Sequence, residues 1–393
     1  MEDLVYWIWL QQALKYGSHK VKLVAELYDD IGDFYAGGEQ EWRVCGIFSN
    51  KEIEKMKSTT IWYAKEIIKK CNFIKCEAIS YADERFPYLL KQIENPPAVI
   101  YVRGDLKCLD NAVSVAVVGT RKASEYGAIM AREFCEEFAK NGAVVVSGGA
   151  MGIDSIAHDI TLKYGGKTIC VLGCGLDYSY LPGKAFLRKQ IENSGAVVSE
   201  YPPETPAYST NFPIRNRIIS GLALGTVVIE AGEKSGSLIT ANLANEQNRD
   251  VYIIPPLAEN LYASGSTSLI RDGARVVSSA SEILEEYRIR RIPQNNFAFG
   301  SHRASKKSYE FKNFGKDIIK KSHNQGCATK PKSTSNLSEI QKSVFDLISK
   351  GKIHIDKIAE SLDRPTYELI ATLTELEISG YISSLPGKYY EVI

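Results

Sequence analysis

The sequence predicts an α/β protein, in which a doubly wound parallel sheet is preceded by a small helical domain and followed by a winged-helix domain. Between about residues 110 and 285, six continuous apolar runs alternate with amphipathic helical stretches, the pattern of a parallel sheet covered on both faces. The first 75 residues show helical periodicity only. The last 58 residues combine helical stretches with a terminal hairpin pattern, as in a winged helix.

The first domain, residues 1–75, is predicted to be a bundle of short helices similar to SAM or helix-hairpin-helix modules. Asn50 is a candidate N-cap for the last helical stretch. The glycine-containing segment 35–42 is predicted to connect two helices. Apolar residues recur at helical spacing in residues 3–14, 19–29 and 50–71.

The second domain, residues 76–285, is predicted to hold the sheet. Residues 76–110 are expected to add an edge strand or a lead-in. Nearly every later strand ends in glycine, serine or proline, and ligands of doubly wound sheets bind at the carboxyl edge, so the turns there are the candidate sites. The predicted strands lie within residues 113–120, 143–149, 167–175, 196–202, 225–232 and 250–256.

The turn after the first of these strands has the residues of an anion-binding nest. Gly119 allows a tight turn, Thr120 and Ser124 offer hydroxyls, and Arg121 offers a forked cation at a helix N-terminus. The turn is not GxGxxG, and no acidic residue follows the second strand to hold a ribose, so dinucleotide binding is disfavoured. A tight turn without a ligand is the alternative.

The turn after the second strand, "VVSGGAMGIDSIAH", can present successive backbone N–H donors. A hydrolase would pair Ser147 with His158, but no GxSxG elbow is present, and we expect His158 to be structural. Met151 occupies the middle of the turn, where a cation would serve an anion better. The candidate donors are Ser147, Gly148, Gly149 and Gly152, with Asp154 bracing the turn.

The turns after the third and later strands add further polar groups. Tyr178 and Tyr180 can stack a base, and Lys184 adds a cation. Arg215 and Arg217 admit two interpretations: ion pairs with Glu200 or Glu230, or direct phosphate contacts. The remaining candidates are Asn216, which lies between these arginines, and Ser235, Gly236 and Ser237, which open another helix.

The net charge of +1 hides a strong asymmetry along the chain. Residues 286–335 hold twelve Lys/Arg and three Asp/Glu, and their polar composition predicts a basic flexible linker. Residues 336–393, the predicted winged helix, have a net charge of −3. Its expected recognition helix carries Glu368, Glu375 and Glu377 without a Lys or Arg, which favours a protein–protein or regulatory role over reading a major groove.

Six segments, in this order, resemble the DNA-processing protein A (DprA, also called Smf) family. They are "GTRKASEYG", "SGGAMGIDSIAH", "LGCGLD", "SEYPPETPAYSTNFPIRNRIISG", "EAGEKSGSLITANLANEQNRDVYIIPP" and "SLIRDGA". The resemblance covers about residues 77–280, and the helical start and winged-helix end also match the longer members. It implies a Rossmann-like protein of the cytoplasm that binds single-stranded DNA and loads the recombinase RecA onto it during natural transformation.

The resemblance also implies a homodimer formed through the Rossmann-like domain, no cofactor and no enzymatic activity. It adds four residues to the DNA-binding set proposed above: Tyr126, Gly127, Gly173 and Gly175. The family usually has Arg where this chain has Met151, so one cation at the DNA pocket is missing.

Two other functions remain as alternatives. A nucleotide-processing enzyme of the lysine-decarboxylase-like phosphoribohydrolase type would show PGGxGTxxE, but here "GTVVIE" lacks the PGG. A double-stranded DNA regulator would act through the winged helix, whose acidity opposes that role.

The composition excludes further classes. No run reaches the roughly 18 apolar residues that a membrane span needs, and the N-terminus lacks the cleavage site of a leader peptide. The eight cysteines have no paired zinc-ligand spacing and are expected to be buried thiols of a reducing cytoplasm, without a metal.

Overall fold

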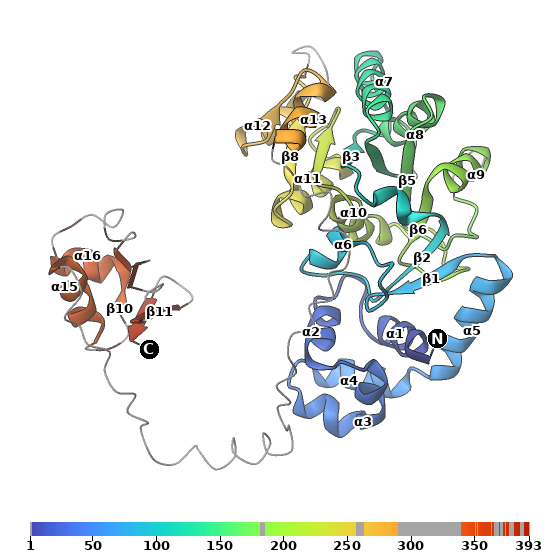
Figure 1. Ribbon diagram of the computed structural model, residues 1–393. Coiled ribbons are helices and arrows are strands. Elements are labelled where there is room, and N and C mark those ends of the chain that lie inside the picture. The colour runs from blue at the N-terminus through green and yellow to red at the C-terminus, as the bar shows by residue number, and fades with distance from the viewer. Residues whose placement is uncertain are drawn as a thin grey trace. The chain divides into compact units, whose positions relative to one another are not determined.

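The structure is a computed structural model that describes residues 2–180, 185–256 and 263–289, and parts of residues 339–392. The chain divides into two compact units, Met1–Lys307 and Ser308–Ile393 (Figure 1). The predicted linker 286–335 therefore lies almost wholly outside the described residues. The predicted domain boundaries at residues 75 and 335 stay predictions.

A nine-stranded sheet forms the centre of the first unit, and the predicted parallel sheet is confirmed. Its strand order is β1-β2-β6-β5-β4-β3-β7-β8-β9. The seven strands from β6 to β9 pair in parallel, whereas β1 and β2 add an antiparallel edge. The strands are β1 (Glu77–Ser80), β2 (Val99–Gly104), β3 (Ser114–Val118), β4 (Val144–Gly148), β5 (Lys167–Leu172), β6 (Ala196–Ser199), β7 (Gly225–Val228), β8 (Asp250–Ile253) and β9 (Arg275–Val276).

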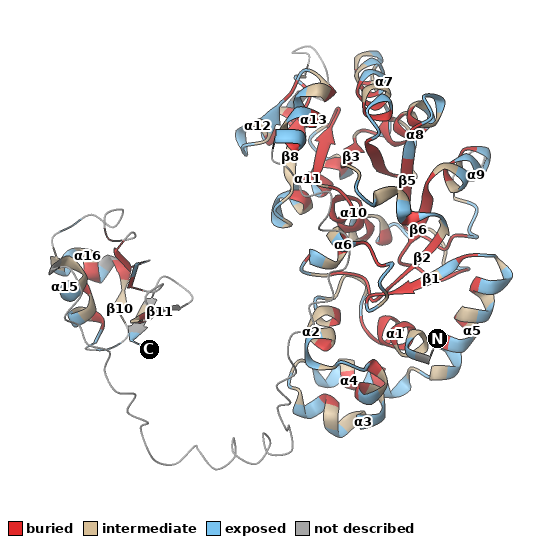
Figure 2. Cartoon of the chain, in the orientation of Figure 1, coloured by how far each residue is buried: buried red, intermediate tan, exposed pale blue. Residues whose placement is uncertain are grey.

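Alternate residues of the central strands enter two separate cores, as a two-sided sheet requires. Val115 and Val117 of β3 pack with helices α7, α8 and α13, whereas Ala116 and Val118 belong to the core on the other face with α10 and α11. Figure 2 shows the strands of the sheet coloured largely as buried between these helices. The helices of this region are α6 (Tyr88–Gln92), α7 (Glu125–Lys140), α8 (Ile153–Lys163), α9 (Ala185–Ser194), α10 (Asn211–Gly221), α11 (Gly236–Glu246), α12 (Ala263–Arg271) and α13 (Ala280–Ile289), with the 3-10 helix η1 (Leu106–Leu109).

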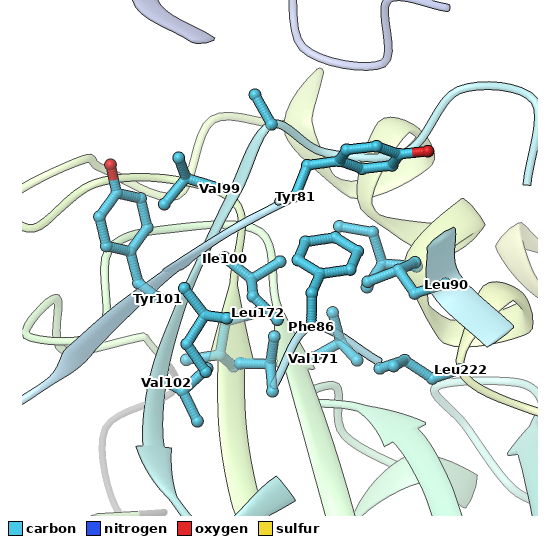
Figure 3. Close-up of a cluster of buried hydrophobic side chains, with 14 of the residues drawn as sticks. Tyr81, Phe86, Leu90, Val99, Ile100, Tyr101, Val102, Val171, Leu172 and Leu222 are labelled. Atoms are coloured by element: carbon cyan, nitrogen blue, oxygen red, sulfur yellow. The ribbon is translucent and has the colours of Figure 1, made fainter. Parts of the chain in front are cut away.

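The antiparallel edge is held to the sheet by an apolar cluster. The Tyr81 and Phe86 rings lie 5.6 Å apart between centroids, next to Leu90 and Ile100 (Figure 3). Residues 76–110, expected as an edge strand or a lead-in, thus supply two strands of the sheet.

The N-terminal helices share the core that contains β2. Gln11 donates a hydrogen bond of 2.7 Å from Nε2 to the Val99 carbonyl, and Trp9 is fully buried in this core. The helices are α1 (Glu2–Ala13), α2 (Lys20–Leu27), α3 (Ile31–Val44), α4 (Asn50–Ser58) and α5 (Ile61–Phe73).

Of two local predictions for this helical region, one is wrong and one is confirmed. The N-cap of α4 is Ser49, whose hydroxyl forms a capping box with Glu52, and Asn50 is the first helical residue. Segment 35–42 contains the predicted glycine connection, because Gly38, with φ 63° and ψ −158°, is not helical and joins two helical parts of Ile31–Val44. Glycine tolerates this left-handed φ, so the chain can turn there between the two parts.

The described part of the second unit has two of the three helices predicted for a winged helix, together with the strands of its hairpin. Strands β10 (Ile353–His354), β12 (Tyr389–Val392) and β11 (Ile382–Leu385) form an antiparallel sheet in that order. Helices α15 (Glu339–Ile348) and α16 (Ile355–Leu362) pack through Val344 and Ile358 into its core. The hairpin turn at Pro386–Gly387, and Glu368 and Glu377 of the expected recognition helix, lie outside the described residues.

Within the described residues, no helix is long and apolar enough to cross a membrane. Seven cysteines are described and all are free thiols, while Cys327 lies outside the described part. The same residues contain no group of three or more His, Cys, Asp or Glu side chains that could hold a metal ion.

Candidate functional site

A cavity of about 650 Å³ opens at the carboxyl edge of β3 and β7. Its walls are the turn after β3, the turn before α8, helix α10 and the first turns of α11. The sequence-predicted site residues that the structure brings to this cavity are Gly119, Thr120, Arg121, Asp154, Arg215, Asn216, Ser235, Gly236 and Ser237. They come from four separate segments of the chain.

The turn after β3 is fixed by Glu230, which follows β7. The Glu230 carboxylate accepts hydrogen bonds from the Ser124 N–H and hydroxyl at 2.9 and 2.7 Å, and its carbonyl accepts from the Thr120 N–H at 2.8 Å. Ser124 also caps α7 by accepting from the Gly127 N–H. These bonds hold the turn so that the exposed Arg121 side chain lines the cavity.

The turn before α8 packs directly against the turn after β3. Gly152 has a φ of +78°, and a Cβ there would lie 2.4 Å from the Thr120 carbonyl oxygen, so glycine is required. The Ile153 N–H donates to the same carbonyl at 3.2 Å. Met151 is 58% exposed beside this contact.

Arg215 is the buried cation of the cavity. Its residue is 4% exposed, and its guanidinium donates a hydrogen bond of 2.8 Å to the Val171 carbonyl. Its Nε has no hydrogen-bond partner, and no carboxylate of the described residues lies within 4.0 Å of the guanidinium. Burial lowers the pKa of Arg215, because the site solvates the charged guanidinium less well than water does.

Asp154 lies near Arg215 and closes the floor of the cavity. A Cβ on Gly148 would lie 2.6 Å from its Oδ2 and 2.1 Å from Nη1 of Arg215, so only glycine leaves room for both side chains. Burial raises the pKa of the Asp154 carboxyl, while Arg215 and the Ala150 N–H act in the opposite direction. The Ala150 N–H donates to Asp154 at 3.3 Å, which braces the turn.

Phe212 connects the two arginines of the cavity. The guanidinium carbons of Arg121 and Arg215 lie 5.7 and 5.9 Å from its ring centroid, within cation–π range. Sequence reasoning missed Phe212, although it precedes Arg215 by three residues and therefore shares its face of α10. Other cavity residues that were missed are Ser209, Gly232, Lys234 and Thr240.

Several predicted residues have structural roles beside the cavity. Ser147 is fully buried and donates to the Val117 carbonyl at 2.6 Å, and Tyr126 donates to the Pro255 carbonyl at 2.9 Å. His158 is buried, with its ring nitrogens 2.8 and 2.9 Å from Thr168 Oγ1 and the Gly148 carbonyl. The predicted residues that do not line the cavity are Ser124, Tyr126, Gly127, Ser147, Gly148, Gly149, Gly152, Gly173, Gly175, Tyr180 and Arg217.

Three of these residues support the cavity from behind. The Tyr180 ring lies 5.2 Å from the Phe212 ring between centroids, and a Cβ on Gly173 would lie 3.1 Å from Phe212. The Gly175 N–H donates to the Thr205 carbonyl at 2.8 Å, which fixes the loop that leads to Phe212. Lys184 lies outside the described residues.

Arg217 forms a buried ion pair rather than a cavity wall. Its Nη2 lies 2.6 Å from Oε1 of Glu200, and both side chains are 2% exposed. Of the two interpretations of Arg217, an ion pair with Glu200 is the one that the structure shows. Arg215 and Arg217 therefore have different surroundings although one residue separates them.

The cavity is built to hold an anion. Arg121, Arg215 and Lys234 line it, and Asp154 is the one carboxylate among the described residues around it. The N-terminus of α11, capped by Ser235, opens into the same cavity and adds the positive end of a helix dipole. An aromatic ring between two guanidiniums suits a flat group attached to that anion, such as a base next to a phosphate.

Comparisons with known proteins show which proteins this chain resembles. A family model described as DNA recombination-mediator protein A matches residues 77–288, and one described as DprA winged helix domain matches residues 328–388. The chain is 39% identical over 221 residues to the DNA processing protein DprA of Bacillus subtilis, covering 56% of this chain and 73% of that protein.

Two solved structures are also similar. DNA processing protein A from Streptococcus pneumoniae has a TM-score of 0.61 and 32% identity, over 71% of this chain and 95% of that one. DNA processing protein A from Helicobacter pylori has a TM-score of 0.50 and 28% identity, over 55% of this chain and 97% of that one. The latter structure was described for its unique single-stranded DNA binding mode.

Proposed function

This chain belongs to the DNA-processing protein A (DprA/Smf) family, and from that premise we propose that it binds single-stranded DNA by holding a phosphate of the strand in the cavity around Arg215. Further, we propose that it protects incoming strands and loads RecA onto them during natural transformation. We also propose that the protein forms a homodimer through its Rossmann-like domain and acts in the cytoplasm.

The observation that carries the proposal is the buried guanidinium of Arg215 without a carboxylate partner. Asp154 lies near this guanidinium but forms no ion pair with it within 4.0 Å, so it offsets only part of the charge. A buried cation that is only partly neutralised costs free energy, and a bound anion would supply the missing negative charge. The Nε without a hydrogen-bond partner offers a further donor for that ligand. A phosphodiester oxygen has the charge and the acceptor geometry that a guanidinium binds best.

The aromatic wall of the cavity favours a single strand over a duplex. The Phe212 ring lines the cavity beside the two arginines, and Tyr180 packs behind it with ring centroids 5.2 Å apart. A base can reach such a ring only when its own face is free, and a duplex keeps its bases paired and stacked. The relative from Helicobacter pylori, which was described for single-stranded DNA binding, supports the same choice.

We propose a binding protein rather than an enzyme. In the alternative, a nucleotide-processing enzyme, Glu230 would act on a substrate, but here its carboxylate accepts two hydrogen bonds from Ser124 and fixes a turn. Release of a free base from nucleoside monophosphates would favour the enzyme. For the winged helix we propose a protein-binding or regulatory role, in keeping with its net charge of −3.

The proposal is tested by titrating fluorescent oligonucleotides and following anisotropy, with a single strand and the matching duplex at several salt concentrations. We expect tighter binding to the single strand, and an affinity that falls as salt rises because bound phosphates release counterions. Arg121→Ala should weaken binding to all sequences alike and flatten the logarithmic salt slope by about 0.7 to 1. Preference for the duplex would reject the proposal.

Met151→Arg is expected to tighten single-strand binding and to steepen the salt slope by about 0.7. Met151 is 58% exposed and follows Ala150, which lines the cavity. An arginine at this position can therefore reach the cavity mouth without disturbing the core. The same titration measures it, with Met151→Gln as the uncharged control. Equal affinity of the Arg and Gln variants would place this side chain away from the bound strand.

A further inference from the structure

The outward face of helix α5 carries large aromatic side chains that the fold does not use. Helix α5 buries Ala64, Ile67 and Cys71 against the core. At 100° per residue, the opposite face is formed by residues that start at Trp62 and end at Phe73, about 16 Å further along the axis. We call this face the α5 stripe: Trp62, Lys65, Glu66, Lys69 and Phe73.

The two aromatic residues of the stripe are among the most exposed large apolar side chains of the described residues, as is Phe186 at 75%. Trp62 is 67% exposed and Phe73 is 87% exposed, whereas Trp7, Trp9 and Trp42 are at most 5% exposed. Single exposed apolar side chains are ordinary, but two large rings on one face opposite the core indicate a surface that contacts something else.

The charge of this region is complementary to a polyanion. Residues 50–75, which form α4 and α5, hold seven lysines and three glutamates. Residues 1–49 hold four Lys/Arg and eight Asp/Glu, so the positive charge of the helical region is concentrated on these two helices. Within the α5 stripe, Lys65 and Lys69 lie between the two rings. The Lys69 side chain is 71% exposed and forms a surface ion pair of 2.6 Å with Glu66, which a phosphate can replace at little cost.

The C-terminal half of α5 is joined to the loop that leads to the phosphate cavity. Lys70 forms an ion pair with Glu204, whose N–H donates to Asp177 at 2.7 Å. Both acidic residues belong to loops at the carboxyl edge, after β6 and β5. The loop from Glu204 continues to Ser209 and Phe212 of the cavity, and Tyr208 on the way is 58% exposed.

We propose that the α5 stripe binds a second stretch of the same single strand that the cavity holds, with bases stacked on Trp62 and Phe73 and phosphates near Lys65 and Lys69. This inference rests on the proposed function. Two rings with lysines between them on one face suit a single strand, because every base has a face to stack and every linkage carries a charge. An anionic membrane would instead need a continuous apolar face, which two lysines interrupt here.

The test compares oligothymidines of about 6 and about 20 nucleotides, the shorter matched to the cavity and the longer able to reach α5. We expect the double variant Trp62→Ala/Phe73→Ala to bind the longer strand about tenfold more weakly and the shorter strand unchanged. Arg121→Ala should weaken both. Ile289→Ala, which removes an 80% exposed side chain from α13, is the matched control and should change neither.

A second readout uses the exposed tryptophan directly. Long oligothymidine should quench the emission of the wild-type protein, and Trp62→Phe should abolish this quenching while it keeps an aromatic ring for binding. The inference is overturned if the double variant binds the longer strand as tightly as the wild type does. It is also overturned if the wild type binds phosphatidylserine vesicles and the double variant loses only that binding, with DNA binding unchanged. If the wild type binds neither length, the proposed function itself is wrong.

Discussion

Arg215→Met is expected to weaken single-stranded DNA binding by about tenfold to a hundredfold, more than any other substitution of a single cavity residue. Hydrogen bonds to charged groups contribute about 1.5 to 3 kcal/mol, and this guanidinium is buried, where water screens the interaction least. Methionine keeps the length and most of the volume of the side chain, so the cavity wall is preserved. Anisotropy titration of a labelled single strand measures the loss.

Arg215→Lys is the matched control for this prediction. It keeps the charge but loses the fork that can donate to Val171 and a phosphate at once, so we expect an intermediate affinity. If the methionine and lysine variants bind as the wild type does, Arg215 does not contact the strand. If both variants lose affinity equally, the planar guanidinium matters and the charge alone does not.

The stability of Arg215→Met relative to the wild type should fall as the pH rises. The pKa of Asp154 is raised in the folded protein by burial, so its contribution to stability is present below its unfolded pKa and lost as pH rises through the folded value. Removing Arg215, which acts to lower this pKa, raises it further. Thermal unfolding of the variant should therefore approach that of the wild type at acid pH and fall below it at neutral pH.

The sequence predicted where the site would lie, because strand ends and glycine turns are local features. Apolar runs that stop at glycine mark the carboxyl edge of a parallel sheet, and the structure places Thr120, Arg121 and Ser235 around one cavity there. Ser147 shows the limit of this reasoning. It ends such a run, yet its hydroxyl donates to Val117 inside the sheet, since the last residues of a strand are still part of the ladder.

The choice between Arg215 and Arg217 could not be made from the sequence. Two residues along a helix rotate the side chain by about 200°, so the two arginines face different neighbours. Which face meets Glu200 and which meets the cavity depends on how α10 packs against the sheet. The same holds for Phe212, whose importance comes from the two guanidiniums that tertiary packing brings to its ring.

Helix ends were predicted less well than helices. Ser49 and Asn50 are both good N-cap residues, and the capping box with Glu52 requires the spacing from Ser49. Apolar periodicity over residues 50–71 continues through Thr59 and Thr60, but the structure ends α4 at Ser58 and begins α5 at Ile61. Both threonines are β-branched and take extended backbone angles, which breaks the helix without a glycine or proline to signal it.

Glu200→Ala is expected to lower the free energy of unfolding by about 3 to 5 kcal/mol, the largest stability effect among the substitutions considered. Glu200 and Arg217 are each 2% exposed, so the alanine leaves an unpaired cation in the core. Arg217 lies where the N-terminal helices meet α10, because a Cβ on Gly17 would lie 3.5 Å from its Nε. Chemical denaturation followed by circular dichroism measures the loss.

The double variant Glu200→Leu/Arg217→Met distinguishes the cost of an unpaired charge from the contribution of the ion pair itself. Oε2 of Glu200 and Nε of Arg217 lack hydrogen-bond partners. The attraction between the two charges therefore offsets only part of the free energy that their desolvation costs. Replacing both charges by apolar groups of similar length should therefore restore most of the stability that Glu200→Ala loses. Because Arg217 does not line the cavity, the folded double variant should bind single-stranded DNA as the wild type does. Loss of binding by this folded variant would instead mean that Arg217 contacts the strand.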